Sequence, residues 1–213
     1  MPAYDLVFFD CDSTLSTIEG IDELAMRAGV NVKALTDAAM AGELPLADVY
    51  RKRLELINPT SADFAWLAQR YAETALPDTA EVIGQLQNMG VACHVISGGL
   101  FPGVAPFAET LGIQPQHVHA VPYDPANPEA TFQHPLARNG GKPEIVAAVG
   151  ATLGIPQARR LLIGDGVSDL EARSAVGIFV GFGGVVTRQE VLEKADVFLN
   201  KPHLGGLIPI VQG

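Results

Sequence analysis

Residues 4–14 read Tyr-Asp-Leu-Val-Phe-Phe-Asp-Cys-Asp-Ser-Thr, and this segment carries the strongest structural signal in the chain. Its first six residues are a short run rich in aromatic and aliphatic side chains, which is typical of a buried strand in a parallel sheet. The run gives way at once to two aspartates, Asp10 and Asp12. The segment therefore predicts a buried strand with acidic side chains at its carboxyl end.

Similar apolar runs recur along the chain, and helix-like stretches separate most of them. Strands that alternate with helices predict a doubly wound α/β fold with a mostly parallel, Rossmann-like sheet. In such folds ligands bind beyond the carboxyl ends of the strands. The later predicted strands are 91–96, 118–121, 160–163, 177–180 and 197–199, and the predicted helices among them are 79–88, 101–111, 142–153, 169–174 and 187–193.

Residues 16–75 interrupt this alternation, because their pattern is helical throughout and contains no strand candidate. The predicted helices here are 20–27, 32–41, 46–56 and 61–74. We therefore expect two units. One is an α/β core made of residues 1–15 and 76–213. The other is a small helical cap of residues 16–75, inserted after the first strand and standing over its carboxyl end.

The composition limits the classes of molecule that the protein can bind. The formal net charge of −10 argues against nucleic acid or an anionic membrane as a partner. No apolar run reaches the ~18 residues that a membrane helix needs. Two cysteines make no disulfide framework, so we expect a cytoplasmic protein. An acidic protein that binds an anion must gather a few cations and backbone N–H groups locally.

Asp10 and Asp12 are the first candidate site residues. Residues two apart at a strand end point to the same side, so the spacing predicts two neighbouring carboxylates. Their repulsion raises one pKa unless a cation lies between them, and Mg²⁺ accepts one or two carboxylates together with phosphate oxygens. The alternative is a solvated turn, since Asp, Ser and Thr are common turn residues.

Three further fragments carry groups that suit phosphate or metal. Ser97 and Gly98 follow a strand, where a hydroxyl and flexible backbone N–H groups suit a phosphate oxygen. Lys142 stands at a helix start, where a cation is unfavourable unless an anion binds nearby. Asp165 ends an apolar strand between two glycines, and Asp169 follows. Each fragment alone is also an ordinary turn or cap, but all fall where a doubly wound sheet collects its ligands.

The order of these motifs resembles the haloacid dehalogenase superfamily. Its phosphatase branch has Asp-x-Asp-x-Thr, then Ser or Thr, then Lys, then Gly-Asp-x-x-x-Asp, which here are residues 10–14, Ser97, Lys142 and 164–169. Within the superfamily, residues 9–15 and 19–25, with 39–44 and 50–54, are similar to the phosphoserine phosphatase family. The resemblance implies a magnesium-dependent hydrolase that cleaves phosphoserine through an aspartyl-phosphate.

The same resemblance implies a role for each matching residue. Asp10 would be the nucleophile and Asp12 the acid/base. The metal ligands would be Asp10, Asp12 through its backbone carbonyl, and Asp165, with Asp169 orienting Lys142 and the metal's shell. The substrate-binding residues would be Glu19 for the ammonium, Arg53 for the carboxylate, Met40 in the pocket wall, Ser97, Gly98 and Lys142 for the phosphoryl oxygens, and Ser168, where the family more often has Asn or Thr.

Several alternatives remain open at this point. Glu19 is also a suitable helix-start acid, and Arg53 could pair with Glu55 or Asp48 on a helix surface. The substrate could be another small phosphomonoester, and the chain could be a monomer or a homodimer. A phospho-accepting binding module without turnover would have little use for Asp12. A cysteine-based phosphatase would need an arginine soon after Cys11, and none follows before residue 27.

Overall fold

The structure is a computed structural model of the chain, and it describes residues 2–32, 35 and 46–213. Six parallel strands form one sheet in the order β3-β2-β1-β4-β5-β6. This arrangement confirms the predicted doubly wound α/β fold. The strands are β1 (Leu6–Phe9), β2 (Ala92–Leu100), β3 (Val118–Val121), β4 (Arg160–Gly164), β5 (Ile178–Phe182) and β6 (Val197–Leu199).

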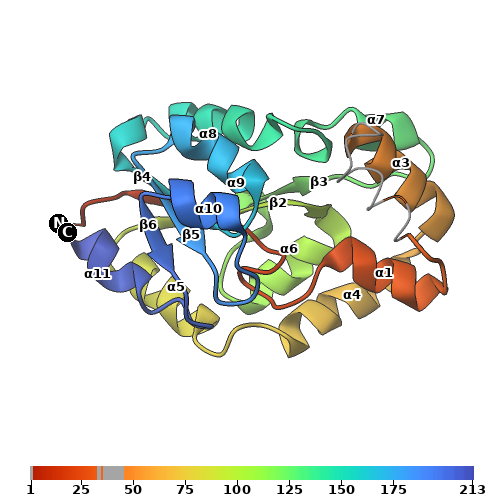
Figure 1. Cartoon of the computed structure of the whole chain (residues 1–213), viewed down its shortest axis with the longest axis horizontal. Helices are drawn as coiled ribbons and strands as arrows, with labels where there is room; N and C mark the ends of the chain where they lie inside the picture. Colours follow the sequence, from red (N-terminus) through yellow and green to blue (C-terminus); the bar gives the residue numbers. More distant parts are fainter. Residues whose placement is uncertain (1, 33–34, 36–45) are drawn as a thin grey trace.

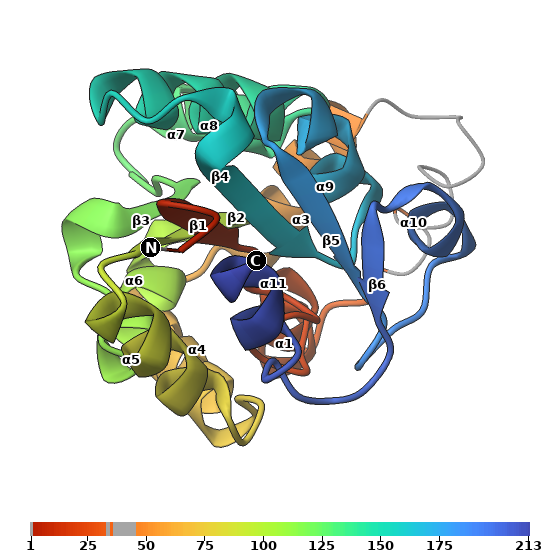
Figure 2. The same cartoon turned by 90° about the vertical axis from the view of Figure 1, so that its left-hand side faces the viewer.

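Helices cover both faces of the sheet. In Figure 2, α8 (Gly141–Thr152) and α9 (Val167–Glu171) lie on one face, and α5 (Thr79–Asn88), α6 (Phe101–Thr110) and α11 (Leu207–Gln212) lie on the other. The central strands β1 and β4 therefore have every residue buried. This two-sided burial explains why their sequences are continuous apolar runs rather than alternating ones.

Three described helices belong to the predicted cap: α1 (Gly20–Ala28), α3 (Leu46–Ile57) and α4 (Ser61–Glu73). They group at one end of the molecule (Figure 1). The chain enters and leaves this region side by side, since Ser16 and Ala75 form an antiparallel bridge. The hydroxyls of Ser16 and Thr74 are also 2.7 Å apart. The division at residues 16–75 stays a prediction, and most of the helix predicted at 32–41 lies outside the described residues.

Several elements differ from the sequence expectations. β2 continues past Ile96 to Leu100, with an irregular register against β3, so Ser97 and Gly98 lie within the strand. The excursion after β3 contains a short helix, α7 (Pro128–Phe132). The helix expected at 187–193 is α10 (Gln189–Lys194), and α11 was not predicted. None of the helices in the described part of the chain has the length and apolar character needed to cross a membrane.

A cluster of histidines lies between β2 and β3. Nδ1 of His94 and Nε2 of His119 are 2.9 Å apart, and the His117 ring stacks on His94 at a centroid distance of 4.5 Å. Burial, together with the neighbouring imidazoles, lowers the pKa of His94 to about 3. Burial and His117 lower the pKa of His119 to about 4. The imidazoles of His94 and His119 are therefore neutral in the folded protein near neutral pH.

We predict that this cluster makes stability sensitive to mild acid. The folded-state pKa values of His94 and His119 lie below the value of about 6.5 for an unfolded histidine. Their contribution is therefore complete above that pH and is lost as the pH falls toward 4. Each should remove ~1 kcal/mol from the free energy of unfolding between about pH 7.5 and pH 5.5, measured by urea denaturation.

The control for this experiment is a histidine outside the cluster. A His94→Asn/His119→Asn double variant should lose this part of the pH dependence, whereas a variant of the exposed His203, His203→Asn, should keep it. A double variant with the wild-type pH dependence would contradict the prediction.

Candidate active site

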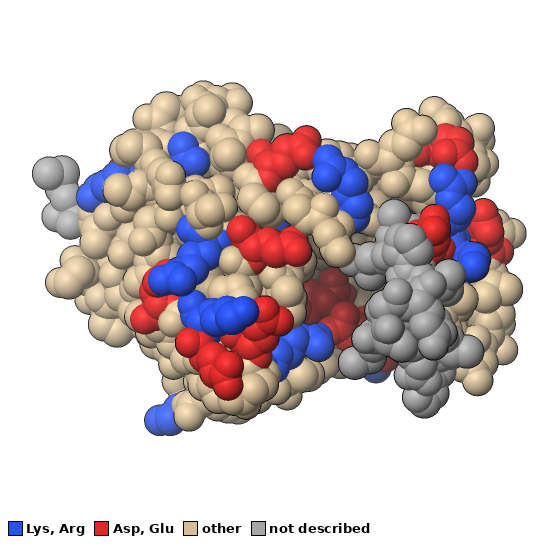
Figure 3. Space-filling model, turned by 45° about the horizontal axis from the view of Figure 1, so that its top comes forward, with Lys and Arg blue, Asp and Glu red and all other residues tan. Residues whose placement is uncertain are grey.

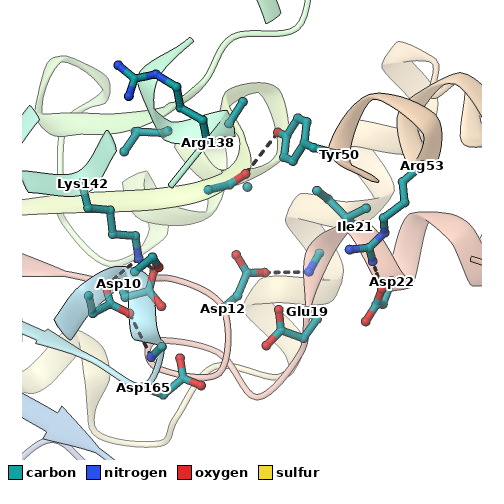
Figure 4. Close-up of a pocket in the computed structure, with 18 of the residues that line it drawn as sticks. Asp10, Asp12, Glu19, Ile21, Asp22, Tyr50, Arg53, Arg138, Lys142 and Asp165 are labelled. Atoms are coloured by element: carbon teal, nitrogen blue, oxygen red, sulfur yellow. Dashed lines mark hydrogen bonds and ion pairs between the residues drawn. The ribbon is translucent and has the colours of Figure 1, made fainter. Parts of the chain in front are cut away.

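The strand ends and helix starts singled out in the sequence line a single cavity of about 230 Å³ (Figure 4). Asp10 follows β1, and Asp165 follows β4. Because β1 and β4 are parallel neighbours, their carboxyl ends bring these two aspartates together. The predicted site residues that line the cavity are Asp10, Asp12, Glu19, Arg53, Gly98, Lys142, Asp165, Ser168 and Asp169. Met40 lies outside the described residues.

Lys142 is the cation at the centre of the site. Its Nζ donates to Oδ1 of Asp10 at 2.7 Å and to Oδ1 of Asp169 at 2.5 Å, and the side chain is 6% exposed. Burial by itself lowers the pKa of a lysine, but the Asp10 and Asp169 carboxylates outweigh it and hold the pKa above its ordinary value. Lys142 is therefore fully charged and fixed against the predicted nucleophile.

The local backbone is built to place Lys142 there. Gly140 has φ 75°, a left-handed conformation that favours glycine, immediately before α8 begins. A Cβ on Gly141 would lie 1.8 Å from the carbonyl oxygen of Pro135, so a side chain at this position would push the start of α8 away. The Gly-Gly-Lys sequence thus reflects close packing in front of the lysine.

Three buried carboxylates form an acidic cluster: Asp10, Asp165 and Asp169, whose ligand atoms lie within 4.8 Å of one another. Burial and the charge of Asp10 raise the pKa of Asp165 to about 8. The same two effects raise the pKa of Asp169 to about 7, although Lys142 opposes the shift. Lys142 and Arg188, which pairs with Asp165, bring two positive charges against three carboxylates, so hard oxygen ligands here suit a divalent cation.

The Asp169 carboxylate both pairs with Lys142 and caps a helix. Its Oδ1 accepts from Lys142, and its Oδ2 accepts from the backbone N–H of Gly166 at 3.0 Å, which caps the first turn of α9. A Cβ on Gly164 would lie 2.2 Å from the Asp169 carboxyl carbon. The glycine before Asp165 is therefore needed to admit the Asp169 carboxylate.

Asp12 has a different environment from Asp10. Its Oδ1 accepts from the Gly20 N–H at 2.6 Å and from the Tyr71 hydroxyl at 2.7 Å, while Ser97 donates to its Oδ2 at 3.1 Å. Burial, followed by the charge of Asp10, raises the pKa of Asp12. The Asp12 carboxylate is thus turned away from the acidic cluster, and a metal contact through its backbone carbonyl stays a prediction.

The irregular segment of β2 at residues 97–99 lies beside Asp12. The Gly99 N–H donates to Oγ of Ser97 at 2.9 Å, and the Gly98 carbonyl accepts from the Tyr50 hydroxyl of α3 at 3.1 Å. A Cβ on Gly99 would lie 3.0 Å from Oγ of Ser97. The small residues therefore allow the backbone to fold tightly around the buried Ser97 hydroxyl, and Gly98 and Gly99, but not Ser97, line the cavity.

Glu19 and Arg53 lie on the cap side of the cavity. Glu19 accepts from the Ser13 hydroxyl at 2.8 Å, and burial with the charge of Asp12 raises its pKa to about 7. Arg53 forms an ion pair with Asp22 rather than with Asp48 or Glu55. In the described part of the chain its buried Nε has no hydrogen-bond partner. An anion that accepted a hydrogen bond from this Nε would remove the cost of a buried, unsatisfied donor.

Sequence reasoning missed several cavity residues, of which Arg188 is the most prominent. Its Nε donates to Oδ2 of Asp165 at 3.0 Å, and its guanidinium is 3.6 Å from Glu19. Arg188 precedes α10, on the loop that follows β5, so the strand-end rule applied to β5 would have found it. Figure 3 shows acidic side chains deep in a hollow of this face, with basic side chains nearby.

Comparison with known proteins agrees with this geometry. The family model of haloacid dehalogenase-like hydrolases matches residues 7–173. The chain is 34% identical over 200 residues to the phosphoserine phosphatase of Drosophila melanogaster, covering 91% of this chain and 74% of that protein. It is 33% identical over 201 residues to the phosphoserine phosphatase of Homo sapiens, covering 92% and 88%.

Two solved structures extend the comparison to three dimensions. A phospho-aspartyl intermediate analogue of phosphoserine phosphatase has a TM-score of 0.76 and 27% identity, covering 98% of this chain and 99% of that one. A substrate-bound phosphoserine phosphatase complex has a TM-score of 0.76 and 26% identity, covering 98% of both chains. These matches confirm the fold and the family resemblance found in the sequence.

We predict that Lys142→Met strongly destabilises the protein, because it leaves Asp10 and Asp169 buried without their counter-charge. Breaking a buried ion pair costs ~3–5 kcal/mol. The measurement is urea denaturation near pH 8 with a chelator present. The matched control is Lys194→Met, which removes an exposed pair with Glu190 and should cost under ~0.5 kcal/mol. A loss for Lys142→Met as small as that of the control would contradict the prediction.

Proposed function

Because the chain belongs to the phosphoserine phosphatase family of haloacid dehalogenase-like hydrolases, we propose that it hydrolyses O-phosphoserine to serine and inorganic phosphate. The observation that carries this proposal is the set of residues that line one cavity. On one side a buried carboxylate, Asp10, is held by Lys142. On the other side Glu19 and Arg53 offer one anion and one cation. The first pair of residues suits the phosphate end of a phosphorylated amino acid, and the second pair suits its ammonium and carboxylate.

The proposed chemistry begins with Asp10. One of its carboxylate oxygens attacks phosphorus and forms an aspartyl-phosphate while the bond from phosphorus to the seryl oxygen breaks. Asp12 gives its proton to the seryl oxygen. It then takes a proton from the water that attacks phosphorus, while the bond from phosphorus to Asp10 breaks, which releases phosphate and restores the Asp10 carboxylate. The raised pKa of Asp12 supports this role, since its environment favours the protonated acid. Lys142, Ser97 and the Gly98 N–H hold the phosphoryl oxygens.

We propose Mg²⁺ as the metal. Asp10 and Asp165 would hold it through their carboxylates, Asp12 would hold it through its backbone carbonyl, and Asp169 would orient the site through Lys142 and Gly166. The fit is supported by three crowded carboxylates that lack sufficient positive charge among the described residues. When bound, the ion would neutralise charge on the transferred phosphoryl group.

The amino-acid end of the substrate would occupy the cap side of the cavity. The substrate carboxylate would accept hydrogen bonds from the unsatisfied Nε and the rest of the Arg53 guanidinium, and the substrate ammonium would pair with Glu19. An ammonium beside Glu19 would favour its ionised form, although burial now raises its pKa to about 7. From the family resemblance, Met40 is proposed as part of the pocket wall, and Ser168, which lines the cavity, as a further substrate-binding residue.

The remaining expectations follow from composition and burial. We propose a small phosphomonoester rather than nucleic acid as the partner, because the net charge is −10. A monomer or homodimer is proposed as the assembly. A cytoplasmic location is supported by Cys11 and Cys93, which are both buried and unpaired.

A substrate panel tests the proposed function. We expect Mg²⁺-dependent multiple turnover with phosphoserine, measured as phosphate release, and at least ~10-fold lower kcat/KM for sugar phosphates and nucleotides, because these lack the paired ammonium and carboxylate. Arg53→Ala should lower kcat/KM for phosphoserine and leave the weak sugar-phosphate activity nearly unchanged.

Two controls accompany the panel. Asp10→Asn should abolish turnover of every phosphomonoester while the protein stays folded, since the nucleophile is lost. Arg27→Ala, which removes an exposed cap arginine paired with Asp63, should behave like the wild type. A preference for sugar phosphates that is insensitive to Arg53→Ala would overturn phosphoserine as the substrate.

Mg²⁺ should stabilise the folded protein, because it binds the folded acidic cluster and not the unfolded chain. At 100 times its dissociation constant the gain is about 2.7 kcal/mol, measured as a rise in Tm on adding MgCl2 to metal-free protein. Asp165→Asn should remove most of this rise. The exposed Asp124 supplies the control variant Asp124→Asn, which should retain it. An Asp165→Asn variant with a full Mg²⁺ response would exclude Asp165 as a ligand.

A further inference from the structure

Tyr71, on cap helix α4, reaches across to Asp12 in the core. Its hydroxyl donates to Oδ1 of Asp12 at 2.7 Å, and the side chain is completely buried. The Tyr71 ring stacks on Phe107 of α6 at a centroid distance of 5.4 Å. A buried hydroxyl clamped by ring stacking has little freedom to leave its acceptor, so this contact is a fixed feature of the site.

A second donor reinforces the same oxygen. The Gly20 N–H, at the start of α1, donates to Oδ1 of Asp12 at 2.6 Å. A Cβ at Gly20 would lie 1.9 Å from the Tyr71 hydroxyl oxygen. Glycine at this position therefore lets both donors approach one carboxylate oxygen. Tyr71 and Gly20 thus both donate to the same oxygen of Asp12.

We infer that Tyr71 is a positioning residue for the reaction, one that fixes which oxygen of Asp12 exchanges a proton with the substrate. This inference rests on the proposed role of Asp12 as the acid/base. Oδ1 has two donors, whereas the described residues give Oδ2 one, the Ser97 hydroxyl at 3.1 Å, so the transferable proton belongs on Oδ2. Oδ2 thus lies beside the segment of β2 proposed to bind phosphate.

The proton balance follows from this division of the two oxygens. In the first step the proton leaves Oδ2 for the seryl oxygen as its bond to phosphorus breaks, and the negative charge left on Asp12 is stabilised by the Tyr71 and Gly20 donors at Oδ1. In the second step Oδ2 recovers a proton from the attacking water. Hydrogen bonds to an ionised carboxylate are stronger than those to a neutral one, so Tyr71 helps most when the proton has left.

The leaving group separates this role from a purely structural one. A seryl alkoxide is a poor leaving group and needs a proton, whereas p-nitrophenolate departs without one. A residue that acts through the acid therefore affects phosphoserine cleavage selectively. Damage to the segment of β2 proposed to bind phosphate, or to the general packing, would instead slow both substrates alike. The ratio of the two losses in kcat/KM is thus the informative quantity.

The experiment compares Tyr71→Phe with Tyr123→Phe. Tyr71→Phe keeps the ring that stacks on Phe107 and removes the hydroxyl. We expect kcat/KM for phosphoserine to fall about 10–100-fold and that for p-nitrophenyl phosphate to fall less than ~3-fold. Tyr123 packs against Phe64 away from the cavity, so Tyr123→Phe should match the wild type on both substrates. Equal losses on the two substrates, or no loss on either, would overturn the inference.

A double-mutant cycle gives a second measurement that needs phosphoserine alone. If Tyr71 acts through Asp12, adding Tyr71→Phe to Asp12→Asn should lower the residual kcat/KM by less than ~3-fold, because the acid is already gone. A full additional loss in the Asp12→Asn background would also overturn the inference. Failure of the proposed function is visible separately, since the wild type would then not turn over phosphoserine at all.

Discussion

Three buried carboxylates lie around one buried ammonium, and the rest of the structure is arranged to maintain this unfavourable concentration of charge. Asp10 follows β1, Asp165 and Asp169 both follow β4, and Lys142 lies at the start of α8. Removing such groups from water is costly unless each has partners. The apolar strands β1 and β4, buried on both faces, supply the rigid frame that holds the carboxylates in place against their repulsion.

The same constraint resolves the apparent conflict between a net charge of −10 and an anionic substrate. The protein does not need a positive surface, because its cations are placed singly at defined positions. Lys142 lies against the predicted nucleophile, Arg188 against Asp165, and Arg53, on α3, at the cavity. Lys142 and Arg53 are largely buried, where their interaction with an anion is screened less than at the surface.

Much of the fold and of the site could be predicted because the responsible signals are local. An apolar run that ends in an aspartate identifies both a buried strand and a functional residue, as at Asp10 and Asp165. Lys142 was found because a cation at a helix start is anomalous. The resemblance to a known family then connected Glu19 and Arg53, which simple spacing could not assign. The fold prediction was confirmed, and the roles of the individual residues stay predictions.

Other features depend on contacts between distant segments and leave no mark in the local sequence. Tyr71 lies 59 residues from its acceptor in the chain and reads as an ordinary helix residue of the cap. The rotation of Asp12 away from the acidic cluster follows from a loop in which Ser13 has φ 53°, a conformation that side-chain alternation along a strand does not foresee. Arg188 was missed because its strand, β5, carries no acidic motif at its end.

The place of the insertion gives these distant contacts a common cause. The predicted cap, residues 16–75, begins within a few residues of Asp12 and ends beside the same point, where Ser16 and Ala75 are bridged. Cap helices α1 and α4 can therefore donate directly to Asp12, through Gly20 and Tyr71, while α3 carries Arg53 to the other side of the cavity. One inserted segment thus supplies both the donors that orient the proposed acid and the cation proposed to recognise the leaving group. A change in the predicted cap that alters recognition of the leaving group is therefore expected also to alter proton transfer from Asp12 to the leaving group.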